Sequence, residues 1–213
     1  MGNAAAGATG FFRQTCAGFG LRLWLALPLR RTTGRGGGGW RGFVGKHAGR
    51  FAGQMPIPQV RFLHMPMEEI YFPAASFDIV LSSLALHYVA SFSDLVNRIY
   101  HCLADCGWFV FSTEHPIFTA QGPQDWCYDE AGHIRHFPVD RYFDEGPRQA
   151  VFLGETVTKY HRTLTTLLQT LLANGFTLRQ VVEPQPPAHL MDQDGMKDEL
   201  RRPMMLIVAA QKA

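Results

Sequence analysis

The sequence predicts an α/β fold in which helices flank a mostly parallel sheet, and three consecutive segments carry this prediction. An apolar strand at residues 78–82 is followed by a helical pattern at 91–104 and by a second strand at 108–112. Short connections between such segments are typical of a parallel strand–helix–strand crossover unit. A length of 213 residues favours one main domain.

The elements that lead into this unit are less regular. We expect a short strand at residues 60–63, and then a connector at 67–72 that Pro73 closes. Between residues 92 and 103 the apolar side chains recur at helical spacing, which indicates an amphipathic helix. Ser91 or Ser93 is a suitable N-cap, and Cys106 with Gly107 marks the end of the helix.

The second half of the chain continues the alternation of helices and strands after an interruption. Residues 121–155 are polar, aromatic and rich in turn-forming residues, so they indicate an insertion at about 119–156. Leucines at helical spacing from 164 to 172 predict a second amphipathic helix that ends at Asn174 and Gly175.

The C-terminal part of the sequence predicts two strands with a polar connection between them. A strand is expected at residues 176–182, followed by a proline-rich stretch and a polar helix that ends near Arg201 and Arg202. The last predicted strand spans residues 204–210.

Composition excludes several classes of protein. A net charge of +2 gives no reason to expect a nucleic-acid or membrane partner, and no apolar run approaches the roughly 20 residues that span a bilayer. The cysteines form no C-x-x-C pair, so we expect free thiols in a reducing compartment and no metal site; they are Cys16, Cys102, Cys106 and Cys127. We therefore expect a cytoplasmic protein.

Residues 1–54 follow a different compositional rule from the rest of the chain. They are rich in Gly, Ala and Arg, and the first acidic residue of the whole sequence is Glu68. A glycine run such as that at 34–42 loses too much chain entropy on ordering to fold by itself. We predict an atypical, poorly ordered segment at 1–54 and a folded domain at 55–213.

Four stretches carry a resemblance to a known family. They are SFDIVLSSLALHYV from residue 76, FSDLVNRIYHCLADCG from 92, WFVFSTEHPIF from 108 and RRPMMLIVAAQK from 201. In order and spacing they resemble the second half of a class I S-adenosylmethionine-dependent methyltransferase, in particular the type 11 methyltransferase domain, over about residues 60–212. The resemblance implies a Rossmann-like sheet whose last strand is antiparallel, here with residues 176–182 and 204–210 paired.

The absence of a catalytic triad is compatible with the chemistry of this family. Methyl transfer from a sulfonium is an in-line displacement, so alignment of donor and acceptor supplies much of the rate, up to roughly 7–11 kcal/mol. The resemblance implies S-adenosylmethionine as the cofactor and methylation of a small-molecule substrate.

The resemblance also implies which residues lie along the cofactor. Ser82, Ser83 and His87 would lie beside its methionine part. Pro66 stands where the family commonly has an acidic residue for the adenine, and Met67 could pack against that ring. In the alternative interpretation, the two serines end a strand and His87 packs under a helix.

The substrate side is expected at the end of the next strand. His115 is a candidate general base, because an unperturbed imidazole titrates near neutral pH; its alternative is a structural histidine at a strand end. By resemblance, the insertion covers the substrate pocket, and its candidates to shape that pocket are Tyr142, Arg148 and His161.

The strongest motif of the family, a D-x-G-x-G-x-G loop after the first strand, is absent. The sequence therefore predicts a sheet whose N-terminal part is incomplete, with impaired cofactor binding. Residues 44–49 read in another frame can encode Ser-Glu-Asn-Met-Leu, which resembles a family segment. We hypothesise that residues 1–54 are a frame-shifted translation of the missing half.

Other interpretations of the chain remain open. The arginine-rich, acid-free start resembles a mitochondrial transit peptide, and MGNAAA begins like a myristoylation signal but has Ala6 where Ser or Thr is expected. The fold could serve as a catalytically inactive scaffold for a protein partner, and GRGGGGWRG could contact RNA.

Overall fold

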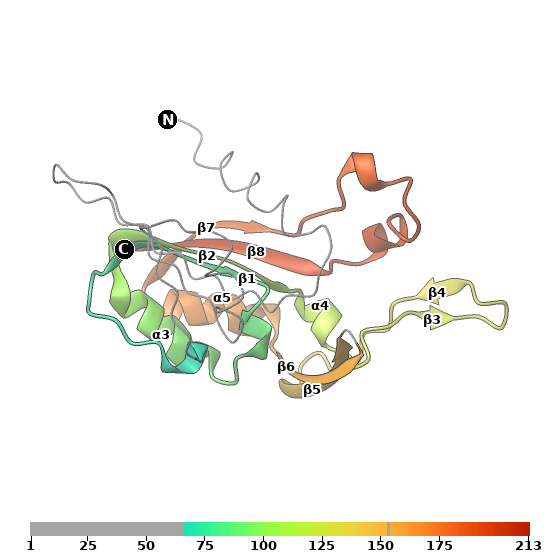
Figure 1. Cartoon of the computed structure of the whole chain (residues 1–213), viewed down its shortest axis with the longest axis horizontal. Coiled ribbons are helices and arrows are strands. Elements are labelled where there is room, and N and C mark those ends of the chain that lie inside the picture. The colour runs from blue at the N-terminus through green and yellow to red at the C-terminus, as the bar shows by residue number, and fades with distance from the viewer. Residues whose placement is uncertain (1–65, 153) are drawn as a thin grey trace, which may run out of the picture.

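The computed structural model describes residues 66–152 and 154–213, and its centre is a sheet of four strands in the order β1–β2–β8–β7 (Figure 1). The strands are β1 (Phe77–Ser83), β2 (Leu103–Glu114), β7 (Phe176–Val182) and β8 (Met205–Lys212). β1 and β2 are parallel, and β8 is antiparallel to both β2 and β7. β1, β2 and β7 therefore run in one direction, which confirms the predicted mostly parallel sheet with an antiparallel C-terminal strand.

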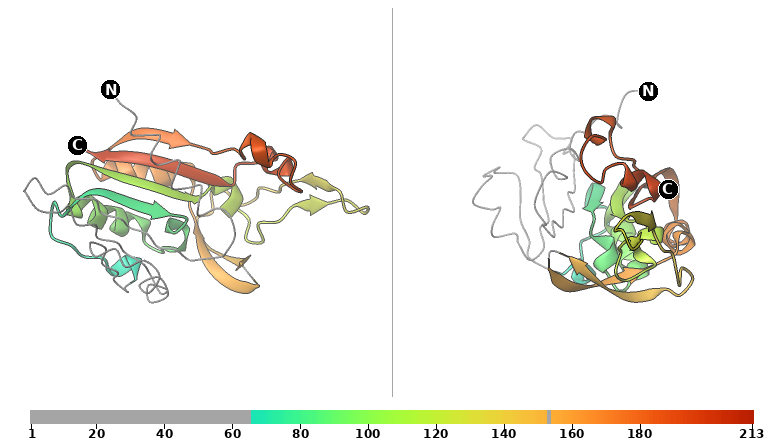
Figure 2. Two further views of the ribbon diagram at one scale, coloured as in Figure 1. Left: turned by 45° about the horizontal axis from the view of Figure 1, so that its top comes forward. Right: turned by 90° about the vertical axis from the view of Figure 1, so that its right-hand side faces the viewer.

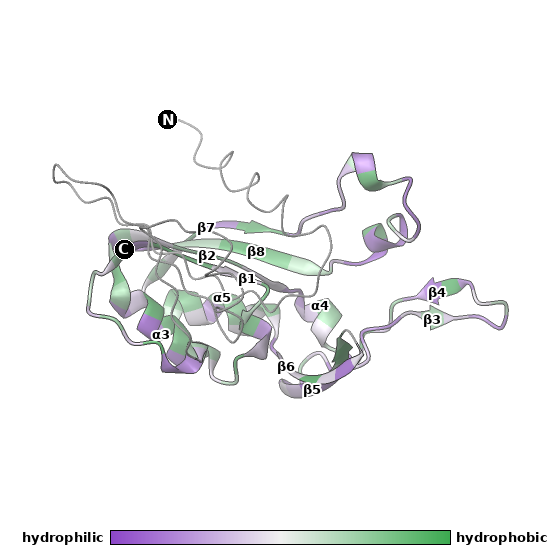
Figure 3. Ribbon diagram, in the orientation of Figure 1, coloured by the Kyte–Doolittle hydropathy of each residue, from purple (hydrophilic) through white to green (hydrophobic). Residues whose placement is uncertain are grey.

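Two amphipathic helices lie side by side along one face of this sheet, α3 (Phe92–Cys102) and α5 (Leu164–Ala173) (Figure 1). Apolar residues three or four apart put a single stripe of each helix against the strands, and Figure 3 shows polar residues alternating with that stripe in α3. The buried side chains of the stripes are Phe92, Leu95, Val96, Ile99, Leu167 and Leu171. Each such side chain contributes roughly 1.5–3 kcal/mol on burial.

The end of α3 differs from the prediction. The helix ends at Cys102, before the predicted residue 104, because Leu103 already pairs with Phe77 as the first residue of β2. Gly107 lets the backbone of β2 approach the Ala104 carbonyl closely, because a Cβ at residue 107 would lie 2.7 Å from that oxygen. β2 is consequently longer than the strand predicted at 108–112.

The end of α5 agrees with the prediction. Gly175 has φ +89°, a left-handed conformation that favours glycine, and its N–H donates to the Leu172 carbonyl. Asn174 adds its side-chain amide, which donates to the Thr170 carbonyl at 2.8 Å. A Cβ on Gly175 would lie 2.9 Å from the Tyr100 hydroxyl, so this turn also packs against α3.

The insertion after β2 contains strands that the sequence did not reveal. It begins with a short helix, α4 (Pro116–Thr119), and forms two hairpins (Figures 1 and 2). The first hairpin pairs β3 (Cys127–Tyr128) with β4 (Ile134–His136), and the second pairs β5 (Gly146–Phe152) with β6 (Glu155–His161). Both hairpins follow the carboxyl end of β2 in the chain, and the β3–β4 hairpin projects away from the sheet (Figure 1).

The connection between β7 and β8 corrects another expectation. The polar helix predicted to end near Arg201 and Arg202 is two short 3₁₀ turns, η3 (Ala188–Leu190) and η4 (Asp198–Arg201). Pro187 precedes the first turn, and Gly195, at φ +81°, separates the two. A continuous helix cannot pass through such a left-handed residue.

This connection is anchored to the insertion through Arg202. Its guanidinium carbon lies 4.8 Å from the ring centroids of Phe118, Trp126 and Phe137, which we name the Arg202 cage. The same guanidinium donates two hydrogen bonds to the Glu199 carboxylate, at 2.8 and 3.1 Å. The cage thus joins α4, both flanks of the β3–β4 hairpin and the end of η4.

Some predictions fall beyond the described part of the chain. The strand expected at 60–63 and the segment 1–54 lie outside the described residues. Within residues 66–152 and 154–213, no helix is long and apolar enough to cross a membrane.

Candidate functional site

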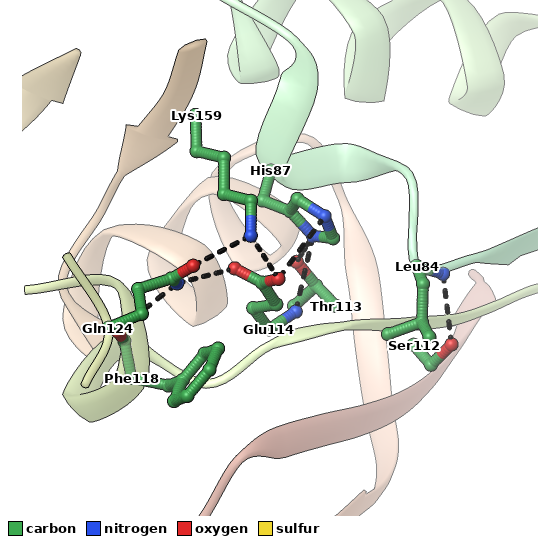
Figure 4. Close-up of polar contacts among 8 residues, drawn as sticks. All are labelled: Leu84, His87, Ser112, Thr113, Glu114, Phe118, Gln124 and Lys159. Carbon is green, nitrogen blue, oxygen red and sulfur yellow. Dashed lines mark hydrogen bonds and ion pairs between the residues drawn. The ribbon is translucent and has the colours of Figure 1, made fainter. Parts of the chain in front are cut away.

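Side chains from β2, the insertion and the loop after β1 meet at the carboxyl ends of β1 and β2 (Figure 4). Leu84, which follows β1, has φ +47°, and its N–H donates to the Ser112 carbonyl at 2.9 Å and lies 3.1 Å from the Ser112 hydroxyl. This turn leads the chain into a 3₁₀ turn, η2 (Leu86–Tyr88). His87 is thereby directed back over the end of β2.

His87 is buried and neutral. Burial lowers its pKa to about 4, with Lys159 and Arg162 acting in the same direction and Glu114 opposing them. Its Nδ1 accepts from the Glu114 backbone N–H at 3.3 Å and lies 3.3 Å from the Thr113 hydroxyl. Because Nδ1 accepts, these partners assign the proton of the neutral ring to Nε2.

A buried ion pair lies beside His87. The Lys159 ammonium, on β6, is 2.6 Å from Glu114 Oε1 and 2.7 Å from Gln124 Oε1. The Gln124 amide in turn donates to Glu114 Oε2 at 2.8 Å and to the Phe118 carbonyl at 3.2 Å. The Lys159 side chain is 3% exposed, so this pair is far less screened by solvent than a surface salt bridge.

His87 and Glu114 border a small cavity of about 10 Å³, which is about the space for one water molecule. Its polar lining comes from His87, Thr113, Glu114, Thr119, Tyr160 and Arg162. Arg162 donates to the carbonyls of Val89 and Ala90, the second at 2.9 Å. The end of β6 is therefore tied to the loop that carries His87.

Glu114, Gln124 and Lys159 were not predicted from the sequence as members of this cluster. Glu114 directly precedes His115 in the sequence, and the other two belong to the insertion. One signal was available, because Val157, Lys159 and His161 lie at alternate positions, and in the structure they are the buried residues of β6. The pairing itself, across 45 positions of sequence, leaves no local signal.

The three predicted substrate-side residues are placed within the insertion, where each has structural partners. His161 Nε2 donates to the Tyr142 carbonyl at 2.8 Å, while its Nδ1 accepts from the Thr119 hydroxyl at 2.8 Å. The Tyr142 hydroxyl accepts from the Leu164 N–H at 3.1 Å, at the start of α5. Arg148 donates to the Ala120 carbonyl at 3.1 Å. Their role in shaping a substrate pocket stays a prediction.

His115 occupies the N-cap of α4. Its Nδ1 accepts from the Ile117 N–H at 3.1 Å, and its Nε2 lies 2.9 Å from Glu183 Oε1. At this distance Glu183 favours a proton on Nε2. Burial lowers the pKa of His115, although Glu183 opposes this. With both nitrogens engaged, its role as a general base stays a prediction.

The predicted cofactor-side residues do not share one surface. Ser82 and Ser83 are consecutive residues of β1, so they point to opposite faces of the sheet. The Ser82 hydroxyl is buried without a hydrogen-bond partner, whereas that of Ser83 lies 3.5 Å from the Ser112 hydroxyl. Pro66 is exposed at the start of η1 (Met67–Glu69), and Met67 packs against the hydrophobic core.

Three of the four cysteines lie in the described part of the chain. Cys102, Cys106 and Cys127 are free thiols, and burial raises the pKa of Cys102 to about 11. Among the residues that the structure describes, no group of three or more His, Cys, Asp or Glu side chains could hold a metal ion.

The chain is similar in sequence and in fold to known methyltransferases. A family model described as a methyltransferase domain matches residues 44–111. A Listeria monocytogenes protein, solved as an S-adenosylmethionine-dependent methyltransferase, is 47% identical, with a TM-score of 0.76 over 80% of this chain and 79% of its own. Another from Mesorhizobium loti is 38% identical, with a TM-score of 0.71 over 77% of this chain and 75% of its own.

A curated relative adds a sequence match of different extent. An uncharacterized protein of Haemophilus influenzae is 29% identical over 166 residues, which are 77% of this chain. The match spans 63% of the length of that relative. The two solved structures confirm the predicted family, whose cofactor is S-adenosylmethionine. The chain belongs to the S-adenosylmethionine-dependent methyltransferases.

Proposed function

We propose that this chain transfers a methyl group from S-adenosylmethionine to a small-molecule acceptor at the carboxyl ends of β1 and β2. The observation that carries the proposal is the meeting of His87, Glu114 and Lys159 there, beneath the insertion (Figure 4). Ligands of open α/β sheets bind at this edge of the strands. Family membership supplies the reaction type.

The described residues fit the methionine part of the cofactor better than its adenine. The buried Ser82 hydroxyl has no partner within the protein, and a polar group of the methionine part would satisfy it. Pro66, in contrast, offers neither an acidic side chain nor a backbone N–H to the adenine. We therefore assign Ser82 to the cofactor and leave Pro66 without a polar contact.

The protein's own contribution is positioning. The cofactor supplies an electrophilic methyl group on a sulfonium. The chain has to orient an acceptor against it and exclude water, which the insertion does by covering the strand ends while the Arg202 cage holds it in place. His87, with its proton on Nε2, offers a hydrogen-bond donor to the cavity.

The closed shape of the site favours a small acceptor. The described cavity beside His87 has a volume of about 10 Å³, so an acceptor there has to displace side chains or enter as a compact group. A macromolecular substrate would need an open groove at this edge.

Methyl incorporation tests the proposal directly. The full chain is incubated with S-adenosylmethionine labelled in its methyl group, together with a cell extract separated into small-molecule, RNA and protein fractions. We expect label in the small-molecule fraction, and a Ser82→Ala variant should need more cofactor for the same rate. Label in the RNA or protein fraction alone would contradict the acceptor class.

A scaffold without turnover is the second candidate function. One observation favours it, because the sequence contains neither the D-x-G-x-G-x-G loop nor any acidic residue before Glu68 to hold the ribose. Calorimetric titration with S-adenosylhomocysteine separates the two. Micromolar affinity supports the enzyme, whereas absence of binding, together with co-elution of a protein partner, supports the scaffold.

A further inference from the structure

We propose that Lys159 is a positioning residue of this site, which holds the Glu114 carboxylate so that His87 stays neutral with its Nε2–H directed to the cavity. The proposal deepens the proposed function and rests on it. Lys159 need not touch the cofactor or the acceptor, because it acts through Glu114 and His87.

The geometry of the ion pair gives the Glu114 carboxylate a fixed position. Each of its oxygens has a separate partner, the Lys159 ammonium on Oε1 at 2.6 Å and the Gln124 amide on Oε2 at 2.8 Å. Gln124 also accepts from Lys159 at 2.7 Å, so the three groups form a closed ring of hydrogen bonds. A carboxylate held from both sides cannot rotate toward the imidazole.

A contribution to stability does not explain the buried Lys159–Glu114 ion pair. Taking two charges out of water costs several kcal/mol, and replacing a buried ion pair by apolar residues is often neutral or stabilising. The Lys159 side chain is 3% exposed and that of Glu114 14%, so this cost applies here. Specific placement of Glu114 beside His87 is a function that an apolar pair could not perform.

The distance between Glu114 and His87 is consistent with that placement. His87 Nε2 lies 3.9 Å from Glu114 Oε1, which is too long for a direct hydrogen bond and short enough for one bridging atom. A hydroxyl oxygen in that gap could accept from the Nε2–H and donate to the carboxylate. Without Lys159, the freed carboxylate would approach the ring and favour a second proton on it.

The protonation of His87 depends on the charges around it, so its titration detects a change in the position or charge of Glu114 and Lys159. Glu114 attracts a proton to the ring, whereas Lys159 and Arg162 repel it. Within the described part of the chain, two tyrosines also lie near the ring: Tyr160 lines the same cavity, and the ring centroid of Tyr88 lies 4.4 Å from that of His87. A change of the His87 pKa on removing the lysine charge therefore reports on Glu114 and Lys159.

The test is NMR titration of His87 in the full chain labelled with ¹⁵N histidine. In the unchanged chain we expect the Nε2–H tautomer from pH 5 to 8. Lys159→Met and Lys159→Gln should each raise the proton affinity of His87 by tenfold or more, because both remove the positive charge that attracts Glu114 and repels a proton on the ring. Lys159→Arg should restore the original titration.

Two controls separate positioning from general effects. The Lys159→Met/Glu114→Gln pair removes both charges, so His87 should return to its low proton affinity. Lys197→Met removes an exposed lysine from the β7–β8 connection and should leave His87 unchanged. Lys159→Gln keeps a hydrogen-bond donor beside Glu114, so it serves if Lys159→Met fails to fold.

The outcomes decide the two proposals separately. An unchanged His87 titration in folded Lys159→Gln would overturn the positioning role, whatever the activity. In the methyl-transfer assay we expect kcat to fall at least tenfold in this variant, with KM for the cofactor unchanged. If the unchanged chain transfers no methyl group, the proposed function fails, while the NMR result still decides whether Lys159 positions His87.

Discussion

Replacing Arg202 by methionine should release the insertion from the rest of the molecule while leaving the sheet intact. The guanidinium has three aromatic rings at 4.8 Å and a two-bonded ion pair to Glu199, and its side chain is 6% exposed. A desolvated cation–π contact is worth about 2 kcal/mol, and hydrogen bonds to a charged group contribute about 1.5–3 kcal/mol. Methionine retains the apolar stem, so we expect a net local loss of about 3 kcal/mol.

Native-state hydrogen exchange measures this local loss. A loss of about 3 kcal/mol corresponds to exchange roughly 100-fold faster for amides of α4 and the β3–β4 hairpin, with β2 and β8 protected as before. Arg179→Met is the matched control, because Arg179 is exposed on β7 and its side chain donates to the Gln211 side chain on β8 at 2.9 Å, away from the insertion. That variant should leave the exchange of α4 and of the β3–β4 hairpin unchanged. Equal acceleration in both variants would refute the argument that the buried cage holds the insertion.

Three further predictions concern single positions. Ser82→Ala should leave the free energy of unfolding nearly unchanged, because its hydroxyl has no partner, and should weaken S-adenosylhomocysteine binding by about 2- to 10-fold in calorimetry. The pKa of His87 falls from 6.5 to about 4 on folding, so the unfolded chain takes up the proton first. Stability from this group should be complete above pH 6.5 and lost as pH falls toward 4, by about 3 kcal/mol; urea midpoints should show a smaller pH dependence in His87→Gln, and an equal one would contradict the low pKa. Gly175→Ala should destabilise by about 1–3 kcal/mol in urea, and by more than Gly132→Ala, since both have positive φ but only Gly175 faces a neighbour, Tyr100. Equal losses would show that Tyr100 moves aside freely.

Periodicity was sufficient to predict the layers of this fold. The apolar spacing in residues 92–103 and 164–172 predicted α3 and α5, and the strands at 78–82, 176–182 and 204–210 correspond to β1, β7 and β8. These elements bury one continuous apolar face, so each leaves a regular pattern in the sequence. The prediction of a helix ending near Arg201 was wrong, because the polar residues of this segment have no apolar periodicity and Gly195 interrupts it.

The candidate site was harder to predict for a physical reason. His87 was predicted through the family resemblance, but its partners are brought to it by tertiary structure alone. Lys159 lies on a hairpin strand with one buried face, and a lysine there indicates a solvated surface unless a buried carboxylate is known to face it. Gln124 and Glu114 likewise have no sequence pattern that marks them as site residues, because they meet only when the insertion folds back over β2.

The position of β8 in the chain determines when the four-stranded sheet can form during synthesis. β8 is the last strand in the chain, yet it lies between β2 and β7 and forms every hydrogen bond that joins those two strands into one sheet. A ribosome releases the chain from its N-terminus. α3, α5 and the aromatic rings of the Arg202 cage therefore emerge while the middle of the sheet and the cage's cation are still missing. The core of the nascent chain stays exposed until β8 has been synthesised, and a ribosome stalled near residue 200 would leave an open sheet for chaperones to protect.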